Sequence, residues 1–373
     1  MQKNGESYEK GMIAMDNNGY ALEIRDVSKR FGGIVATNHA NIKVKQGQIF
    51  GIIGPNGAGK TTLFNMITGV YKPTEGDILL YGKSIAGKLP YQIAREGIAR
   101  TFQNIRLFGD LSVYENVHIA YQKNMSYNFW DGIVKNKRYK QEEETCAKIC
   151  EEALKDMGLW EIRNQLARNL PYGMQRRLEI VRALVTSPKL LLLDEPFAAI
   201  DAKIRTELRS WLKDMIEKLG ITSIFVTHDQ DEAIEVADEI IITNRGRIEQ
   251  KGTPLEVYQN PDTAFTAGFF GQTSVIDDYQ VFNHFEEVPG GEKAIVRPEF
   301  VKVTKKNEEQ KYKSSATEGI VERVAFRGSS LELKVRVGNT ILSARRSLDE
   351  EPVREGEVVD VFVQRIFVTK GNE

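Results

Sequence analysis

The spacing of apolar residues along the chain predicts two regions with different architectures. In the first region, short continuous apolar runs such as 49–53 and 190–193 are separated by longer segments with helical spacing. This pattern is typical of buried parallel strands that alternate with helices, and one such helix is predicted over 208–219. Toward the C-terminus, short strands of alternating polarity dominate, as in 331–337, where a Gly-Asn turn at 338–339 predicts a hairpin. The sequence therefore predicts an α/β fold joined to a smaller all-β fold.

These patterns also set the domain boundaries that we expect. Residues 1–20 are polar and punctuated by Gly and Asn, and we expect a flexible tail there. The α/β domain is predicted to span 21–255, with a longer, more polar and mostly helical insertion over about 89–168. Residues 256–293 are expected to be a linker, and 294–373 a small all-β domain with an OB-like barrel. A chain of 373 residues is long enough for each domain to have its own core.

The composition of the chain limits the partners and the cellular compartment that we expect. The chain carries 51 Lys and Arg against 52 Asp and Glu, a formal net charge of −1, which gives no general case for nucleic-acid binding. No secretory signal is visible, and no apolar run approaches the roughly 20 residues that cross a bilayer. The two cysteines, Cys146 and Cys150, are interpreted as free thiols in a reducing cytosol. Any role at a membrane would therefore require a partner.

A glycine-rich loop gives the strongest chemical signal. Residues 54–61 spell G-x-x-x-x-G-K-T between the apolar run 49–53 and a predicted helix, which is the strand–loop–helix context of a phosphate-binding loop. Glycines let backbone N–H groups turn toward phosphate oxygens, and the helix N-terminus adds its positive end. Lys60 is expected to reach the β- and γ-phosphates, and the Thr61 hydroxyl to ligate Mg²⁺. The residues expected to bind nucleotide here are Gly54, Pro55, Asn56, Gly57, Ala58, Gly59, Lys60, Thr61 and Thr62.

Polar residues near other apolar runs complete the predicted catalytic site. Asp194 and Glu195 directly follow the run 190–193, and ligands bind at this end of the strands in open α/β sheets. Asp194 is expected to hold Mg²⁺, and Glu195 to polarise an attacking water. His228 follows another apolar run and could bond the γ-phosphate and orient the water with Glu195. Gln103 provides a neutral amide that could ligate Mg²⁺ and contact the water.

Together these residues resemble the ATP-binding subunits of ABC transporters. The resemblance covers about residues 22–252 and rests on six elements in the family's order: the phosphate loop, the Gln103 loop, a signature-like segment, the Asp194-Glu195 strand end, Asp201 and His228. It implies ATP as the nucleotide, Mg²⁺ as the metal ion, and ATP hydrolysis coupled to solute transport. It also implies that Phe31 stacks on adenine and that Asp201 contacts a second ATPase subunit.

The signature-like segment departs from the family's usual Leu-Ser-Gly-Gly-Gln. Residues 170–174 read Leu-Pro-Tyr-Gly-Met, so Pro171 replaces the serine whose hydroxyl would contact the γ-phosphate bound by the partner subunit. The resemblance implies that Gly173 keeps a backbone N–H close to that phosphate, and the following helix can still offer its N-terminus. Losing one hydrogen bond to a charged group costs about 1.5–3 kcal/mol. We therefore expect weaker closure over ATP rather than inactivity.

The resemblance changes along the chain, and this leaves the solute open. Residues 99–183 resemble subunits of branched-chain amino acid importers, including Arg-Thr-Phe-Gln at 100–103. From Pro196 onward the chain resembles sulfate or thiosulfate importer subunits, which carry an accessory β-barrel domain, here opening with Val-Arg-Pro-Glu at 296–299. We favour import of sulfate, thiosulfate or a related anion, because a whole added domain is a larger architectural feature than the resemblance of residues 99–183. Import of branched-chain amino acids is the alternative.

The resemblance also implies a set of partners and rival functions. The partners are membrane permease subunits, a second ATPase subunit that is identical or different, and, indirectly, a solute-binding protein, with no nucleic acid expected. The implied location is the cytoplasmic face of the cell membrane, as a peripheral protein. A soluble ABC ATPase acting on DNA or ribosomes is a rival, but such proteins usually carry two ATPase units or a long coiled coil. A nucleotide-regulated module without hydrolysis is another rival, against which Glu195 and His228 argue.

Overall fold

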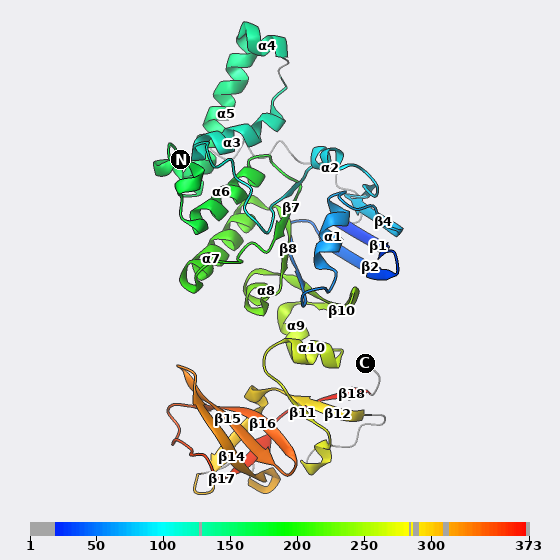
Figure 1. The fold of residues 1–373 in the computed structure, drawn as a ribbon, viewed down its shortest axis with the longest axis vertical. Coiled ribbons are helices and arrows are strands. Elements are labelled where there is room, and N and C mark those ends of the chain that lie inside the picture. The colour runs from blue at the N-terminus through cyan, green and yellow to red at the C-terminus, as the bar shows by residue number, and fades with distance from the viewer. Residues whose placement is uncertain (1–18, 127–128, 283–284, 286–290, 309–312, 371–373) are drawn as a thin grey trace. The chain divides into compact units, whose positions relative to one another are not determined.

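The structure is a computed structural model, which describes residues 19–370 except 127–128, 283–284, 286–290 and 309–312 (Figure 1). Most of the expected flexible tail, residues 1–18, lies outside the described residues. The chain divides into two compact units, 1–254 and 255–373. In the described parts of both units, no helix is long and apolar enough to cross a membrane.

A six-stranded sheet forms the centre of the first unit. Its strand order is β10-β9-β3-β8-β7-β6, with all neighbours parallel except β10 and β9. β3 and β7 are buried along their whole length, which explains their continuous apolar sequences. The strands are β3 (Ile49–Ile53), β6 (Ile98–Arg100), β7 (Leu190–Asp194), β8 (Thr222–Thr227), β9 (Glu239–Asn244) and β10 (Arg247–Gly252).

A second, antiparallel sheet shares a core with the first. Its order is β2-β1-β4-β5, formed by β1 (Tyr20–Phe31), β2 (Ile34–Lys45), β4 (Glu75–Leu80) and β5 (Lys83–Ser84). Leu22 of β1, Phe50 of β3 and Phe64 of α1 (Lys60–Ile67) are fully buried in one hydrophobic cluster. Because α1 begins directly after the phosphate loop, this packing fixes the helix on which the loop depends.

Helices form most of the segment between β6 and β7. They are α3 (Val113–Tyr121), α4 (Phe129–Val134), α5 (Lys137–Asp156) and α6 (Tyr172–Leu184), with 3₁₀ turns at Gln122–Asn124, Trp160–Ile162 and Ala167–Asn169. The predicted insertion is therefore largely helical, although its start contains α2 (Pro90–Glu96) and β6, and β6 pairs with β7. Cys146 and Cys150 are buried on α5 with 3.8 Å between their sulfur atoms. Both thiols are free in the structure, as predicted, and the reducing compartment stays a prediction.

Two helices follow the strands that carry the predicted catalytic residues. α7 (Ala202–Leu219) connects β7 to β8, and α8 (Gln230–Val236) connects β8 to β9. α7 contains the helix predicted over 208–219 and ends at Gly220, which has φ 60° in the left-handed region that favours glycine. Its buried face includes Leu208, Leu212 and Ile216, so its apolar residues are core residues, as their spacing predicted.

The second unit is mostly β structure. A five-stranded antiparallel sheet of order β13-β17-β14-β15-β16 curls over a core that includes Leu333, Val335 and Val361, beside a three-stranded sheet of order β11-β12-β18. The predicted hairpin is confirmed, because Val337 pairs with Thr340 across the turn. The strands are β11 (Ser274–Ile276), β12 (Gly291–Val296), β13 (Val301–Lys305), β14 (Thr317–Phe326), β15 (Ser330–Val337), β16 (Thr340–Ser347), β17 (Val358–Val363) and β18 (Phe367–Lys370).

The segment expected to be a linker, 256–293, contains regular structure. α9 (Pro254–Gln259) and α10 (Ala264–Phe269) lie here, and β11 pairs with β12. Val257 and Ile276 are fully buried, so apolar side chains tie this segment to a core. A 3₁₀ turn at Tyr279–Val281 also lies in this segment, and 3₁₀ turns at Pro298–Phe300 and Lys313–Ser315 follow it along the chain.

A buried carboxyl group closes the connection between β8 and α8. Glu232 is 4% exposed and accepts a hydrogen bond from the Thr227 hydroxyl. Burial raises the pKa of Glu232 to about 7; the nearby Asp229 also raises it, whereas the Thr227 hydrogen bond and, more weakly, Arg209 and Arg205 lower it. Asp229 caps α8 by accepting from two backbone N–H groups. The turn that carries His228 is thus held by a carboxyl group that is partly protonated near neutral pH.

Glu232→Gln is expected to change how the stability of the first unit depends on pH. The folded protein holds this proton up to about pH 7 and the unfolded chain releases it near pH 4.5. The free energy of unfolding of the wild type should therefore fall between those values, by roughly 3 kcal/mol in total. The neutral glutamine removes this slope. Urea unfolding from pH 5 to 8 would measure it by tryptophan fluorescence, since Trp130, Trp160 and Trp211 all lie in this unit.

Asp231→Asn is the matched control for this experiment. Asp231 lies one residue before Glu232 and is exposed, so the variant should retain the wild-type pH slope. An unchanged slope in Glu232→Gln would contradict the assignment of the raised pKa.

Candidate functional site

The phosphate loop has a backbone that favours glycine at three positions. Gly54, Gly57 and Gly59 have φ of 156°, 81° and 97°. A Cβ on Gly54 would lie 2.2 Å from the carbonyl oxygen of Thr243, and one on Gly59 would lie 2.4 Å from that of Ala36. The glycine spacing therefore reflects both backbone conformation and the close approach of β9 and β2.

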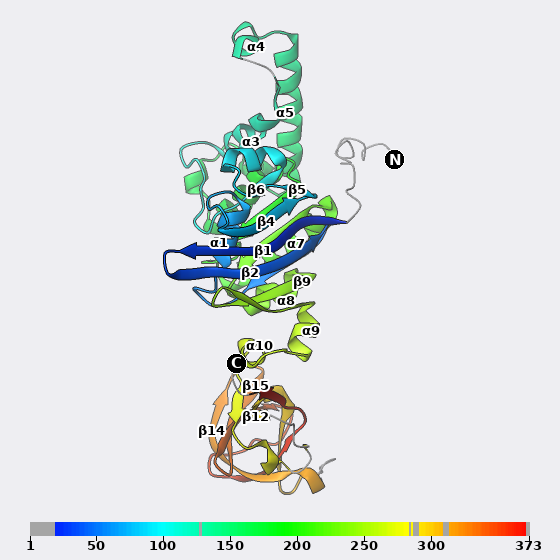
Figure 2. The same ribbon diagram turned by 90° about the vertical axis from the view of Figure 1, so that its right-hand side faces the viewer.

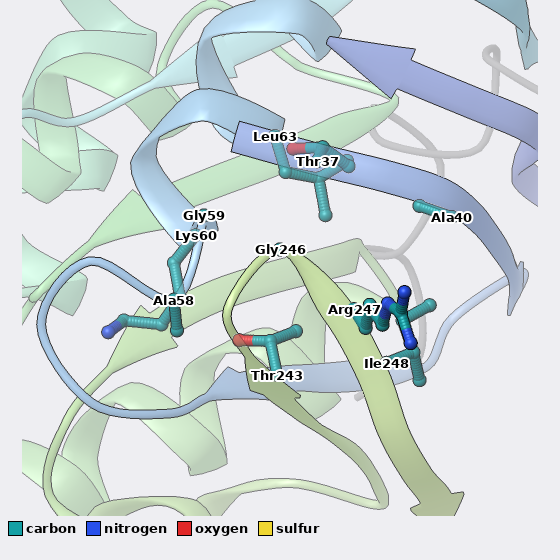
Figure 3. Close-up of a pocket in the computed structure, with 10 residues that line it drawn as sticks. All are labelled: Thr37, Ala40, Ala58, Gly59, Lys60, Leu63, Thr243, Gly246, Arg247 and Ile248. Atoms are coloured by element: carbon teal, nitrogen blue, oxygen red, sulfur yellow. The ribbon is translucent and has the colours of Figure 1, made fainter. Parts of the chain in front are cut away.

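The side chain of Lys60 points into the curve of this loop, as Figure 3 shows. Its Nζ donates hydrogen bonds to the carbonyl oxygens of Gly54 at 2.6 Å and Pro55 at 2.9 Å. The side chain is buried, and burial lowers the pKa of Lys60, whereas the charges of Glu195 and Asp194 raise it. The ammonium group is thus coupled electrostatically to both carboxylates at the end of β7.

The other predicted loop residues lie along the loop and the first turn of α1. Asn56 and Gly57 are exposed, and Ala58 is buried. Thr61 is exposed in the first helical turn, and Thr62 is half-buried. No side chain caps this end of α1, so the backbone N–H groups of its first turn are available to an anion.

Three of the predicted residues meet in one hydrogen-bonded cluster. Gln103 Nε2 donates to Glu195 Oε2 at 2.8 Å, and His228 Nδ1 lies 3.2 Å from Glu195 Oε1. The backbone of Glu195 has φ 44°, in the left-handed region, and its N–H bonds to the carbonyl oxygen of Val226 in β8. The regular strand conformation therefore ends at Asp194, and Glu195 takes a backbone conformation that is uncommon for a residue with a side chain.

Asp194 forms an ion pair that the sequence did not predict. Its Oδ2 accepts from Arg100 Nη2 at 2.7 Å, and both side chains are about nine-tenths buried. Arg100 Nη1 also donates to Asn65 Oδ1 at 2.7 Å and Thr68 Oγ1 at 3.1 Å, both near the end of α1. Arg100 therefore links the predicted magnesium ligand to the helix that follows the phosphate loop.

Arg176 is a second residue that the sequence did not single out as functional. It lies on α6 with 0% exposure, and its guanidinium donates to the carbonyl oxygens of Phe102 at 2.6 Å and Glu195 at 2.6 Å. It also donates to the carbonyl oxygens of Pro196 at 3.0 Å, Asp194 at 3.2 Å and Gln103 at 3.4 Å. One buried side chain thereby joins α6, which begins in the signature-like segment, to the Gln103 loop and the end of β7.

Glu179 completes this arrangement one turn further along α6. Its Oε2 accepts from Arg176 Nη1 at 2.5 Å, and its Oε1 accepts from the backbone N–H groups of Phe102 and Arg106, both at 3.4 Å. An Arg and a Glu three residues apart on a helix normally form an exposed pair. In the sequence, Gln175, Arg176, Glu179 and Arg182 follow the spacing of an exposed polar helix face, so the pattern gave no sign that Arg176 and Glu179 are buried.

Phe31, Gly173 and Asp201 lie on other elements. Phe31 ends β1, is 41% exposed, and packs edge-on against Tyr71 with ring centroids 5.1 Å apart. Gly173 is in the first turn of α6, and Asp201 is the exposed N-cap of α7. Across residues 19–370, apart from the excluded segments, no hydrogen bond or ion pair joins these three to the Glu195 cluster.

Comparison with known sequences matches both units. A family model described as ABC transporter matches residues 37–198, and one described as TOBE domain matches 294–365. The high-affinity branched-chain amino acid transport ATP-binding protein BraF of Pseudomonas aeruginosa is 39% identical over 241 residues, which are 65% of this chain and 94% of BraF. The sulfate/thiosulfate import ATP-binding protein CysA of Mesostigma viride is 34% identical over 329 residues, which are 86% of this chain and 88% of that protein.

Solved structures agree with these sequence matches. MJ1267, an ATP-binding cassette of an ABC transporter in its ADP conformation, has a TM-score of 0.56 and 29% identity over 65% of this chain and 96% of its own. The cbiO1 protein of Clostridium perfringens, part of the ABC transporter complex cbiONQ, has a TM-score of 0.57 and 32% identity. The match covers 65% of this chain and 92% of cbiO1. The chain therefore belongs to the ATP-binding proteins of ABC transporters and is an ATPase of that family with a TOBE domain toward its C-terminus.

Proposed function

We propose that this ATPase hydrolyses Mg·ATP at the phosphate loop, with Glu195 as the residue that activates water. The observation that carries the proposal is the cluster of Gln103, Glu195 and His228, together with the electrostatic coupling of Lys60 to Glu195. A carboxylate held by an amide and an imidazole can accept a proton from water while its orientation is fixed.

The phosphate loop binds the triphosphate through an exchange of hydrogen bonds. Lys60 exchanges its hydrogen bonds to the carbonyl oxygens of Gly54 and Pro55 for hydrogen bonds to phosphate oxygens. Phosphate oxygens are stronger acceptors because they are charged. The uncapped N–H groups at the start of α1 point to the same anion. Phe31 is exposed and braced by Tyr71, which suits stacking on an adenine ring.

The chemistry of three side chains fits a magnesium ion. Thr61 provides a hydroxyl oxygen, Asp194 a carboxylate oxygen and Gln103 an amide oxygen, and Mg²⁺ prefers oxygen ligands of these kinds. When bound, the ion supplies charge neutralisation of the phosphates. In the structure Arg100 bonds the Oδ2 of Asp194 and is the counter-charge of this carboxylate.

A second ATPase subunit completes the site in this proposal. The N-terminal end of α6, which has no side-chain cap and holds Gly173, would face the phosphates bound by that subunit. Asp201, exposed at the start of α7, would contact the same subunit. Pro171 provides no hydroxyl at this interface, so closure rests on backbone N–H groups and is weaker than with serine.

We propose that the imported solute is sulfate, thiosulfate or a related anion. The CysA relative aligns over 86% of this chain, whereas BraF aligns over 65%. Import of branched-chain amino acids is the alternative, favoured by the higher identity of 39% to BraF. In either case we propose permease subunits as membrane partners, with a solute-binding protein acting through them and the ATPase on the cytoplasmic face of the membrane.

Glu195→Gln is expected to separate binding from turnover. Glutamine retains the hydrogen bond from Gln103 but cannot accept a proton, so kcat for ATP hydrolysis should fall by about 100-fold or more. The affinity for ATP should stay close to that of the wild type, and closed dimers should accumulate. Glu217→Gln on α7 is an exposed control that should leave turnover unchanged. Full turnover in Glu195→Gln would refute its assignment.

Arg176→Lys tests whether Arg176 positions the catalytic cluster. Lysine has three donors on one nitrogen, fewer than the five carbonyl oxygens and the Glu179 carboxylate that the guanidinium of Arg176 bonds, so kcat should fall by about tenfold or more, in line with the loss of 1.5–3 kcal/mol. KM for ATP should change little, because Arg176 bonds no residue of the phosphate loop.

The neighbouring Arg177→Lys is the control for this variant. Arg177 stacks on Trp211, with 5.3 Å between the guanidinium carbon and the ring centre, and its replacement should leave kcat unchanged. Equal loss of kcat in both variants, or a parallel rise in KM in Arg176→Lys, would indicate general disruption of α6.

The solute can be tested in the complex with its membrane partner. ATPase activity of the ATPase–permease complex reconstituted in vesicles should rise with sulfate and its binding protein, and should not respond to leucine. Stimulation by leucine but not by sulfate would establish the amino acid alternative.

A further inference from the structure

The helices α4 and α5 form a hairpin that projects from the rest of the first unit, as Figures 1 and 2 both show. The turn between them is well defined. Lys135 has φ 48°, and the Asn136 side chain accepts from the backbone N–H of Tyr139 at 2.9 Å, which caps α5. Asn136 Nδ2 also donates to Asp131 Oδ1 at 2.6 Å. We name residues 130–140 the hairpin tip.

The hairpin tip exposes large apolar side chains on one side of a short helix. Trp130 is 70% exposed, Ile133 57% and Val134 72%. The spacing of three and four residues places all three on the same face of α4. Exposed apolar residues scattered singly are ordinary, but three neighbouring side chains exposed to this extent indicate a contact surface.

The same tip is strongly basic. Between 130 and 140 the sequence has four basic residues and one acidic residue, in a chain whose net charge is −1. Lys135, Lys137 and Lys140 are exposed. Among the residues that the structure describes, no ion pair involves any of these three lysines. Arg138, in contrast, is bonded to Glu142 and to Ser126.

We propose that the hairpin tip docks on an anionic lipid surface. A tryptophan and two aliphatic side chains beside unpaired lysines match the requirements of an interfacial element, in which the apolar face enters the headgroup region and the lysines attract anionic lipids. Protein–protein interface centres are depleted in lysine, so the three lysines favour lipid over a protein partner. α4 has six residues, a length of about 9 Å, and lies on a membrane rather than crossing it.

Docking would give the ATPase an attachment that does not depend on the permease, which departs from the expectation from the sequence that any role at a membrane requires a partner. α5 has 20 residues and is about 30 Å long, so the tip lies well away from the nucleotide site. The hairpin tip contains none of the residues assigned to ATP binding or hydrolysis. Its lipid contact can therefore be altered without changing basal ATPase activity.

Flotation of the purified full-length chain with vesicles tests this proposal. The wild type should float with vesicles of phosphatidylcholine and phosphatidylglycerol, should not float with phosphatidylcholine alone, and should be released by salt. Reversing Lys135, Lys137 and Lys140 to glutamate should weaken binding by about tenfold or more. Trp130→Ser should also weaken binding to anionic vesicles, because it removes the interfacial ring.

Matched controls carry the same chemical changes elsewhere on the surface. Glutamate at the exposed residues Lys45, Lys203 and Lys302 makes the same change in net charge, and Phe326→Ser removes an aromatic ring that is 66% exposed. Both controls should float like the wild type, and every variant should bind ATP with wild-type affinity.

Two results would overturn the proposal. One is equal flotation of the wild type and the tip variants. The other is that the wild type does not bind protein-free anionic vesicles but does bind vesicles that contain the permease, and that the tip variants lose this binding. The second result would establish the hairpin tip as a protein contact.

Discussion

The buried guanidinium of Arg176 is the interaction on which the geometry of the site depends. A charge with 0% exposure is costly unless every N–H has an acceptor, and Arg176 meets that condition with backbone carbonyls and Glu179. The carbonyls belong to the Gln103 loop and the end of β7, so two segments about 90 residues apart share one counter-group. Because Arg176 lies on the helix that starts at the signature segment, a movement of that helix must move the backbone that carries Glu195.

Arginine side chains lie around the Gln103 loop, and two of them balance the charge of the nearby carboxylates Asp194 and Glu179. Arg100 neutralises Asp194, Arg176 neutralises Glu179, and the guanidinium of Arg106 lies 4.3 Å from the ring centre of Phe102. A net charge of −1 for the whole chain conceals this local concentration of positive charge. The negative charge at the end of β7 is therefore offset by the Arg100 guanidinium, which bonds Asp194, and by the Lys60 ammonium, which interacts electrostatically with both acids.

Local motifs were predictable from the sequence, and long-range partners were not. The phosphate loop, Asp194, Glu195 and His228 follow apolar runs whose spacing and context identify them. Arg100 pairs with Asp194 across 94 positions and Arg176 bonds Phe102 across 74, and no local pattern encodes such distances. β6 has three residues, too few to show a period, so it was included in a helical insertion. The linker expected over 256–293 was inferred from a change of composition, which does not reveal that Val257 and Ile276 are buried.

The burial of both cysteines makes this chain convenient for site-specific labelling. Cys146 and Cys150 are its two cysteines, and each is fully buried on α5. A thiol reagent reacts with exposed thiolates, so the native residues are shielded while the protein is folded. A cysteine introduced at an exposed position would be the preferred target without removal of the native pair. Spectroscopic distances between two such labels could then follow the movement of α6 relative to the phosphate loop during the ATP cycle.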